Sequence, residues 1–424
     1  MPEAQGEALL EAVRHCPGGA ELLALTAARD DVALVGGATR DLLLDRRPRE
    51  LDVVVAGDAP LLAGDLADRI AGASAAVRVH ERFRTAVIEW EGGRVDVAER
   101  RAESYPLPGA LPEVRPGTLD EDLGRRDFTV NAIAVVLGGP ARGRLHAAGH
   151  ALEDLATAQL RVLHEQSFID DPTRLVRLAR YEVRLGFRPE ANTAELAAQA
   201  LAAGAPASVS GARLGAELRL ALGEPDPVAT LAALDSLGVL AALDPALRFD
   251  PELARRGLAM LPEDGRPEVL LLAVALLALA GDERRDGAAA IAGLLDGFEF
   301  TAAERDAVLR TALPARSLAE RLQEADRPSR LREAALASTL EGVALAGALA
   351  SERPPYGAAE AAHEWLRRLR HVQLAITGED LLAAGVPAGP EIGRRLAIAL
   401  ASRLDGKLDD GREAELRAAL EARV

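Results

Sequence analysis

Cysteine is nearly absent from this sequence, which excludes several kinds of site. Cys16 is the only cysteine among 424 residues, so an intrachain disulfide and a multi-cysteine zinc site are both excluded. The first residues, Met1, Pro2 and Glu3, lack the basic stretch that opens a secretory signal peptide. These features favour a reducing compartment, and we expect a cytoplasmic protein.

Long hydrophobic runs are missing as well. The longest, residues 269–280, is shorter than the roughly 20 apolar residues that a membrane-spanning helix needs. It predicts a buried helix of a protein core, and we expect no membrane association.

Positive charge comes almost entirely from arginine, because Lys407 is the only lysine. The net charge is −16, whereas general nucleic-acid binders are usually basic. An acidic chain that handles nucleic acid must therefore gather its arginines on one face. Arginine suits that purpose, since its planar guanidinium group matches phosphate.

The hydrophobic pattern predicts a mixed α/β head followed by an elongated all-helical part. The length suggests two to four domains at about 100–200 residues each. Within the first 165 or so residues we expect helices at 5–27, from 39 onward and at 60–72, and strands at 32–35, 51–55, 84–90 and 94–97. Residues 104–118, rich in proline and glycine, predict a loop, and residues 130–137 fit either a strand or a buried helix. From residue 170 the spacing predicts helices and no strand.

The first motif that suggests chemistry lies between an expected strand and helix. Residues 36–41 read Gly-Gly-Ala-Thr-Arg-Asp. Gly36 and Gly37 let the backbone approach a phosphate closely, and the N-terminus of a helix offers free N–H groups to an anion. Arg40 adds a guanidinium group suited to a triphosphate. A tight turn between strand and helix is the alternative interpretation.

The second motif is a group of carboxylates on expected strands. Glu50 and Asp52 alternate along one strand and so point to the same face. Two such carboxylates can hold two Mg²⁺ ions for in-line displacement at a phosphoryl group. Asp96, in a later strand, is a third candidate. Alternatively, these side chains simply face water.

The third motif, residues 125–132, reads Arg-Arg-Asp-Phe-Thr-Val-Asn-Ala. Cations, an anion and an amide surround one apolar residue, which suits the sugar and phosphate of a nucleotide. A charged helix cap before a buried segment is the alternative.

The fourth motif, residues 170–174, reads Asp-Asp-Pro-Thr-Arg at the start of an expected helix. Asp171 and Arg174 are three residues apart and therefore neighbours on one helical face. Cytosine and adenine each present an amino donor beside a ring acceptor, whereas uracil and guanine present the reverse. An Asp that accepts and an Arg that donates would admit C and A and reject U and G. Helix capping alone explains the Asp but not the nearby Arg.

In this order and spacing, the four motifs resemble those of the class II tRNA nucleotidyltransferases and bacterial poly(A) polymerases. Linking segments at 117–123, 210–218, 376–381, 389–393 and 405–406 resemble theirs too. The resemblance covers nearly the whole chain, although residues 225–360 match only in helical character.

The resemblance implies an α+β fold with a polymerase-β-like head at 1–165, a helical neck at 166–222, a helical body at 223–330 and an RNA-binding helical tail at 331–424. It implies catalysis by Glu50, Asp52 and Asp96, with two Mg²⁺ ions on Glu50 and Asp52. The implied nucleotide-binding residues are Gly36, Gly37, Arg40, Arg126, Asp127, Asn131, Asp171, Arg174 and Arg177. The implied substrates are CTP, ATP and the acceptor arm and 3′ end of tRNA; no protein partner is implied.

Two residues depart from the family pattern. Glu50 stands where the family has Asp, which puts the rate and the metal preference in question, and Asp170 stands where the family has Glu. Addition of CCA, of CC or of A alone all remain open, and we expect the switch from C to A to depend on residues 104–118. A poly(A) polymerase, a catalytically impaired tRNA-binding relative and a small-molecule nucleotidyltransferase are the alternatives. The partly acidic C-terminus disfavours the first, and the long helical part disfavours the last.

Overall fold

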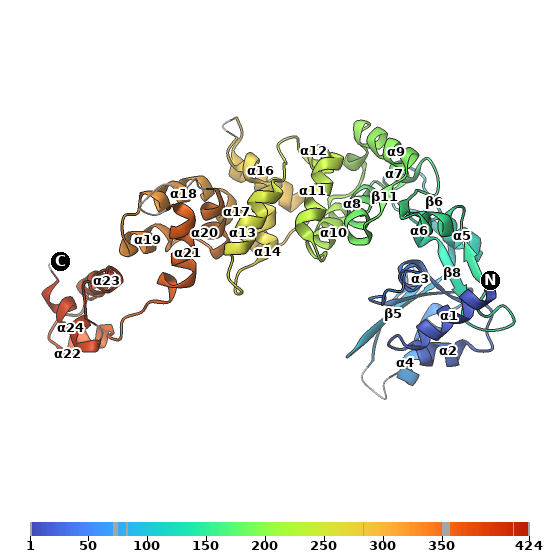
Figure 1. The fold of residues 1–424 in the computed structure, drawn as a ribbon, viewed down its shortest axis with the longest axis horizontal. Coiled ribbons are helices and arrows are strands. Elements are labelled where there is room, and N and C mark those ends of the chain that lie inside the picture. Colours follow the sequence, from blue (N-terminus) through green and yellow to red (C-terminus); the bar gives the residue numbers. More distant parts are fainter. Residues whose placement is uncertain are drawn as a thin grey trace. The chain divides into compact units, whose positions relative to one another are not determined.

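The computed structural model describes residues 2–70, 75–81, 84–282, 284–349, 357–409 and 411–422. The chain divides into two compact units, residues 1–213 and 214–424 (Figure 1). The first unit contains the sheets and the second is helical, so the predicted α+β class is confirmed. The finer division into head, neck, body and tail stays a prediction.

A seven-stranded mixed sheet organises the first unit, in the order β3-β4-β5-β2-β1-β8-β9. Only β2 and β5 are paired in parallel among these described strands. The strands are β1 (Val32–Val35), β2 (Leu51–Val55), β3 (Ala76–His80), β4 (Thr85–Trp90), β5 (Gly93–Glu99), β8 (Ile133–Val136) and β9 (Leu145–Ala147). Two small sheets pair β6 (Arg101–Ser104) with β7 (Glu113–Pro116) and β10 (Gln159–Leu160) with β11 (Arg188–Pro189).

Helices cover both faces of this sheet. Along β1, Val32 and Leu34 belong to one hydrophobic cluster, while Ala33 and Val35 belong to another, because alternate residues of a strand face opposite sides. The first cluster includes α1 (Pro2–Arg14), α2 (Gly19–Thr26) and α4 (Ala59–Ile70), and the second includes α5 (Leu119–Gly124). The sheet therefore holds its strand ends in fixed positions between packed layers.

The rest of the first unit contains further helices. They are α3 (Gly36–Leu43), η2 (Thr129–Asn131), α6 (Ala151–Ala156), α7 (Ser167–Asp170), α8 (Thr173–Leu185), α9 (Ala191–Ala202) and η3 (Ala205–Ser208). Helix α10 (Gly211–Leu222) continues into the second unit.

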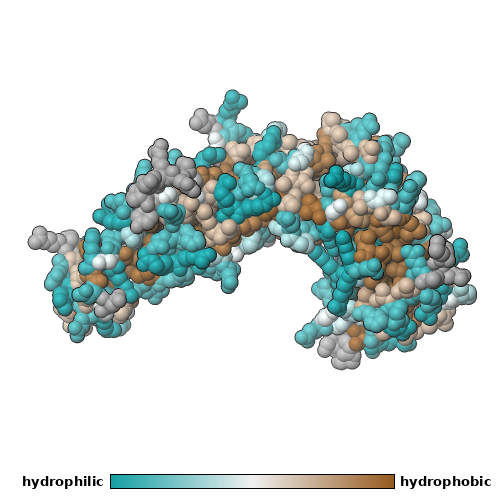
Figure 2. All heavy atoms as spheres, in the orientation of Figure 1, coloured by the Kyte–Doolittle hydropathy of each residue, from teal (hydrophilic) through white to brown (hydrophobic). Residues whose placement is uncertain are grey.

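The second unit consists of helices in the part that the structure describes. They are α11 (Pro227–Leu237), α12 (Val239–Leu243), α13 (Pro251–Met260), α14 (Pro267–Ala275), α15 (Leu277–Ala280), α16 (Gly287–Gly297), α17 (Ala302–Ala312), α18 (Ala315–Glu324), α19 (Pro328–Ala335), α20 (Leu340–Leu349), α21 (Ala358–Arg367), η4 (Leu369–His371), α22 (Gly378–Ala383), α23 (Pro390–Leu404) and α24 (Arg412–Glu421). The apolar run at 269–280 lies in α14 and α15 and is largely buried, as predicted. Hydrophilic residues cover much of the face drawn in Figure 2, and patches of hydrophobic residues lie between them. Among the described residues, no helix combines the length and the hydropathy that a bilayer crossing requires.

Three sequence predictions about secondary structure need correction. The helix expected at 5–27 is two helices, because Pro17 lacks a backbone N–H and Gly18 adopts a left-handed φ of 74° between them. The loop expected at 104–118 contains β7, whose four exposed residues carry no hydrophobic alternation. The strand β11 lies beyond residue 170, where none was expected. The helix expected at 60–72 is α4 as far as Ile70, and residues 71 and 72 lie outside the described residues.

Candidate active site

Three carboxylates converge at one edge of the paired strands β2 and β5. Asp52 and Asp96 are direct partners in the register of these strands, and Glu50 immediately precedes β2. One oxygen from each of the three lies within 4.8 Å of the others. The structure therefore brings together the three carboxylates that the sequence singled out. Oxygen ligands from clustered carboxylates match the preference of Mg²⁺, so the donor set fits that ion.

Burial and like charge act together on Asp52. Burial and the neighbouring charges of Glu50 and Asp96 together raise the pKa of this carboxyl to about 7, against the opposing charges of Arg126 and Arg40. An acidic group in this position retains a proton near neutral pH unless a cation stabilises its charge. Asp52 is thus poised to ionise when a cation binds.

Arg94 forms ion pairs with two of the carboxylates. Its Nε and Nη2 donate to the two oxygens of Asp96 at 2.7 and 2.8 Å. The same Nε lies 3.2 Å from Oε2 of Glu50, and Nη1 lies 3.4 Å from Oε1 of Glu89. The hydrogen bond to Asp96 and the surrounding carboxylates raise the pKa of Arg94, so it is fully charged.

The two glycines begin helix α3 beside the carboxylates. Gly36 has a φ of 68°, and a Cβ there would lie 2.6 Å from Nη1 of Arg126 and 3.7 Å from Oδ2 of Asp52. A Cβ at Gly37 would meet Asp52 Oδ2 only at 3.8 Å. The left-handed φ of Gly36 therefore disfavours a side chain, and an added Cβ would displace the end of the Arg126 side chain. The N-terminus of the helix lies next to Asp52.

A chain of polar contacts joins α3 to α8 through the third motif. Nη1 of the buried Arg40 donates to Oδ1 of Asn131 at 2.5 Å. Nδ2 of Asn131 donates to Oδ1 of Asp127 at 2.9 Å, and Oδ2 of Asp127 lies 2.7 Å from Nη2 of Arg177. Despite burial, which alone would raise it, the charge of Arg177 and the Asn131 hydrogen bond hold the pKa of Asp127 below its ordinary value. Four of the predicted nucleotide-binding residues are thus mutually connected. The Arg40 guanidinium group also lies over the ring of Tyr181, 5.5 Å from its centroid.

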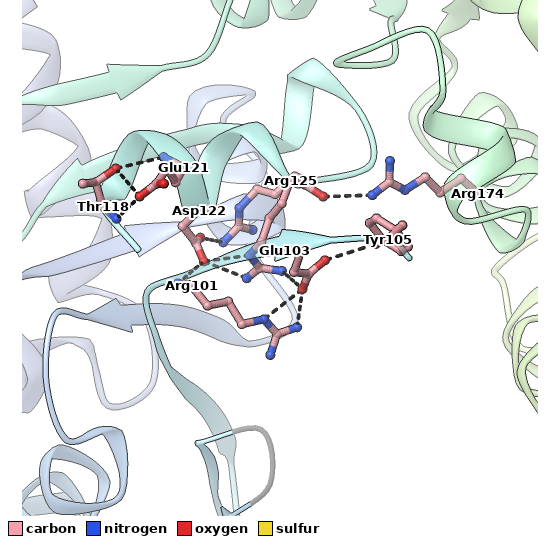
Figure 3. Close-up of polar contacts among 9 residues, drawn as sticks. Arg101, Glu103, Tyr105, Thr118, Glu121, Asp122, Arg125 and Arg174 are labelled. Atoms are coloured by element: carbon pink, nitrogen blue, oxygen red, sulfur yellow. Dashed lines mark hydrogen bonds and ion pairs between the residues drawn. The ribbon is translucent and has the colours of Figure 1, made fainter. Parts of the chain in front are cut away.

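A second network surrounds Arg125 and Arg126. The fully buried carboxylate of Asp122 accepts from Nε and Nη2 of Arg125 at 3.0 and 2.7 Å and from Nη2 of Arg126 at 2.9 Å. Glu103 on β6 accepts from Nη1 of Arg125 at 2.9 Å and from the hydroxyl of Tyr105 at 3.1 Å (Figure 3). These contacts fix the end of α5 where the third motif begins.

Asp171 and Arg174 lie at the start of α8, each held by other groups. Oδ1 of Asp171 accepts from Nη2 of Arg213 at 2.7 Å and from the hydroxyl of Thr173 at 2.6 Å. The buried Arg174 donates from Nη1 to the Ser167 hydroxyl at 2.5 Å and from Nη2 to the carbonyl oxygen of Arg125 at 2.8 Å (Figure 3). The two residues are three apart in sequence. Thr173 and Arg213 hold the carboxylate of Asp171 in place, and Ser167 and the Arg125 carbonyl hold the guanidinium group of Arg174.

Sequence reasoning missed several residues that complete this arrangement. Arg94, Asp122, Glu103 and Ser167 were not selected, although each contacts or supports a residue that was. Arg94 carried a signal, because it lies two residues before Asp96 and hence on the same strand face. Asp122 carried one too, because it precedes Arg125 and Arg126 by three and four residues, a helical spacing. Glu103, in contrast, reaches Arg125 across 22 residues.

Comparison with known proteins places this geometry in a family. Residues 32–161 match the family model described as the poly A polymerase head domain. An A-adding tRNA nucleotidyltransferase of Geobacter sulfurreducens is 33% identical over 410 residues, which is 92% of this chain but only 45% of that protein. A CC-adding tRNA nucleotidyltransferase of Deinococcus radiodurans is 36% identical over 383 residues, covering 89% of this chain and 85% of the relative. The chain belongs to the tRNA nucleotidyltransferase family.

A solved member of this nucleotidyltransferase family has the same fold over nearly its full length. The Thermotoga maritima CCA-adding enzyme, complexed with tRNA, superposes with a TM-score of 0.78 at 27% identity and covers 98% of both chains. The predicted family resemblance is thereby confirmed. The chain spans about half the length of the Geobacter relative.

Proposed function

We propose that this nucleotidyltransferase adds CMP, AMP or both, from CTP and ATP, to the 3′ end of tRNA without a nucleic-acid template and releases pyrophosphate. The observation that carries the proposal is the convergence of Glu50, Asp52 and Asp96 within 4.8 Å, beside the glycine turn that begins α3. Relatives named for A addition and for CC addition support the same chemistry.

The carboxylate cluster is proposed to bind two Mg²⁺ ions through Glu50 and Asp52. Bound metal would lower the pKa of the attacking hydroxyl and stabilise charge on the transferring phosphoryl group. Asp52 contributes a half-buried carboxylate whose raised pKa means that cation binding releases its proton. Asp96, its partner on β5, faces the same space and is positioned to orient the 3′-hydroxyl.

The triphosphate is proposed to lie against the N-terminus of α3. Gly36 and Gly37 keep side chains out of this space, and free N–H groups of the first helical turn face it. Arg126 lies beside Gly36 and adds positive charge. Arg40, buried against Asp41 and Asn131, acts by fixing the third motif relative to α3 and by its charge.

Base selection is proposed to rest on Asp171 and Arg174. Contacts from Thr173 and Arg213 all reach Oδ1 of Asp171, so Oδ2 is the oxygen available to accept an amino group of cytosine or adenine. Arg174, oriented by Ser167 and the Arg125 carbonyl, would donate to the ring nitrogen beside that amino group. Uracil and guanine would place a carbonyl before the carboxylate and an N–H before the guanidinium, which leaves both pairs unsatisfied.

The helical regions are proposed to bind the acceptor arm of tRNA, with the neck at 166–222, the body at 223–330 and the RNA-binding tail at 331–424. The tRNA in the Thermotoga structure supports this assignment. A cytoplasmic location is proposed because a chain with a single cysteine forms no intrachain disulfide and fits a reducing compartment.

One assay tests the proposal and assigns the subtype. Purified tRNA transcripts that end before CCA, after CC or after CCA are incubated with Mg²⁺ and with each of the four NTPs, or with CTP and ATP together. Products are resolved at single-nucleotide length. Addition confined to C and A that stops at a defined length supports the proposal, and the transcripts extended distinguish CCA, CC and A addition. A long A tail on every transcript would indicate a poly(A) polymerase instead.

A further inference from the structure

Arg94 occupies the position in which a metal ion would compete for the carboxylates. Its Nε and Nη2 take both oxygens of Asp96, at 2.7 and 2.8 Å, in the planar two-bond geometry that arginine forms with carboxylates. The same guanidinium group lies 3.2 Å from Glu50. One cation thus contacts two of the three clustered carboxylates and offsets one unit of their negative charge.

The backbone explains why Arg94 reaches both groups. Arg94 and Asp96 are two residues apart on β5, so their side chains share a face of the sheet. Glu50 comes from the segment before β2, the strand that pairs with β5 in parallel. The side chain of Glu50 is one methylene longer than that of an Asp, and its carboxylate reaches the guanidinium group of Arg94.

Arg94 also has a second acidic partner outside the cluster. Glu89 is its cross-strand neighbour in the register of β4 and β5, and Nη1 of Arg94 lies 3.4 Å from Oε1 of Glu89. Glu89 contacts Arg78 of β3 on its other side. Arg94 is about 41% exposed at its side chain, so it has room to turn toward Glu89.

We propose that Arg94 is a resident counterion of the carboxylate cluster, which divalent cations must displace from Asp96 and Glu50 and which then pairs with Glu89. The inference rests on the proposed metal site and deepens it, because it makes Arg94 a determinant of metal affinity. A guanidinium group that holds both oxygens of Asp96 lowers the affinity of the free enzyme for the ion. It also offsets part of the negative charge of the cluster while no ion is bound.

Mn²⁺ binding to the full chain in the absence of nucleotide tests this proposal. Free Mn²⁺ is measured by electron paramagnetic resonance during titration, and binding that remains in Asp52→Asn is subtracted as non-specific. Arg94→Gln is expected to tighten the specific binding about fivefold, the upper range for partly exposed ion pairs. Arg188→Gln is the control, since Arg188 is exposed on β11 and contacts neither the cluster nor Glu89 among the described residues; its affinity should equal that of the wild type.

Two further variants separate competition from positioning. Arg94→Lys keeps the charge but loses the two-bond geometry, so its affinity should lie between those of the wild type and Arg94→Gln. In a Glu50→Asp background the side chain is one methylene shorter and its carboxylate lies farther from Arg94. The gain in Mn²⁺ affinity caused by Arg94→Gln should therefore be smaller in that background. A double-mutant cycle measures the difference.

Unchanged or weaker Mn²⁺ binding by Arg94→Gln would overturn the inference, and weaker binding would show that Arg94 positions the ligands. If the wild type and Asp52→Asn bind Mn²⁺ equally, the metal centre itself is wrong and the mechanism proposed above fails with it.

Discussion

Asp52 and Asp96 are direct partners across the only parallel pair in the seven-stranded sheet, as far as its strands are described. Because the strands are parallel and the two residues are paired in register, their carboxylates lie side by side on one face of the sheet. Glu50, which precedes β2, adds a third carboxylate. We predict that Asp52→Ala lowers nucleotide addition by at least about 100-fold, since even residues that only support a metal ligand cost 10–100-fold. Single-turnover addition to a tRNA transcript measures this, and full activity of the variant would contradict it.

The raised pKa of Asp52 predicts a pH-dependent cost in stability. The folded, metal-free protein keeps the proton up to about pH 7, whereas an unfolded chain releases it near pH 4. Between these values the unfolded state binds fewer protons, so the free energy of unfolding falls as the pH rises.

Asp52→Asn removes this dependence and should stabilise the metal-free protein more at pH 8 than at pH 5, by up to about 3 kcal/mol. Urea unfolding in EDTA at both pH values measures the difference. An equal effect of the substitution at the two pH values would show that Asp52 ionises normally.

Gly36 and Gly37 should respond differently to the same substitution. Gly36→Ala places a methyl group at a φ of 68° and within 2.6 Å of Arg126, so we expect a loss of about 1–2 kcal/mol in stability from the backbone alone, together with displaced Arg126. At Gly37 the nearest atom is 3.6 Å from an added Cβ, so Gly37→Ala should leave thermal stability close to that of the wild type. Thermal unfolding of both variants tests the contrast, and equal losses would show that the strain at Gly36 is not real.

Arg174 should determine which nucleotides are accepted. Arg174→Ala removes the donor oriented by Ser167 and the Arg125 carbonyl, and we expect the preference for C and A over U and G to fall at least about tenfold. Arg188→Ala, an exposed arginine on β11, is the control. Competition assays with mixed NTPs give the ratio of kcat/KM values. An unchanged ratio in Arg174→Ala would mean that other groups read the base.

Local patterns in the sequence predicted most of the site because its motifs follow strand and helix periodicity. Glu50 precedes strand β2 and Asp52 lies two residues later within it, Gly36 and Gly37 begin a helix, and Asp171 precedes one. These relationships need no knowledge of the tertiary fold. The predicted strands at 32–35 and 51–55 agree with β1 and β2 for the same reason.

The contacts that the sequence did not reveal join distant segments. Glu103 reaches Arg125 across 22 residues, and Arg174 reaches the Arg125 carbonyl across 49. Strand β7 escaped prediction because pairing with β6, rather than hydrophobic alternation, forms it. Such pairings depend on the folded arrangement of the chain and leave no periodic signal.

The central claim is metal-dependent addition of C and A by the Asp52 cluster. The most direct measurement follows a tRNA transcript lacking CCA, with radiolabelled CTP or ATP and Mg²⁺, for the wild type and Asp52→Ala side by side. The account predicts that the wild type adds a defined number of C or A residues, with one pyrophosphate released for each, and that the variant adds none in the same time. No addition by the wild type to any tRNA end, with Mg²⁺ or Mn²⁺, would contradict the account and indicate a tRNA-binding relative that has lost catalysis.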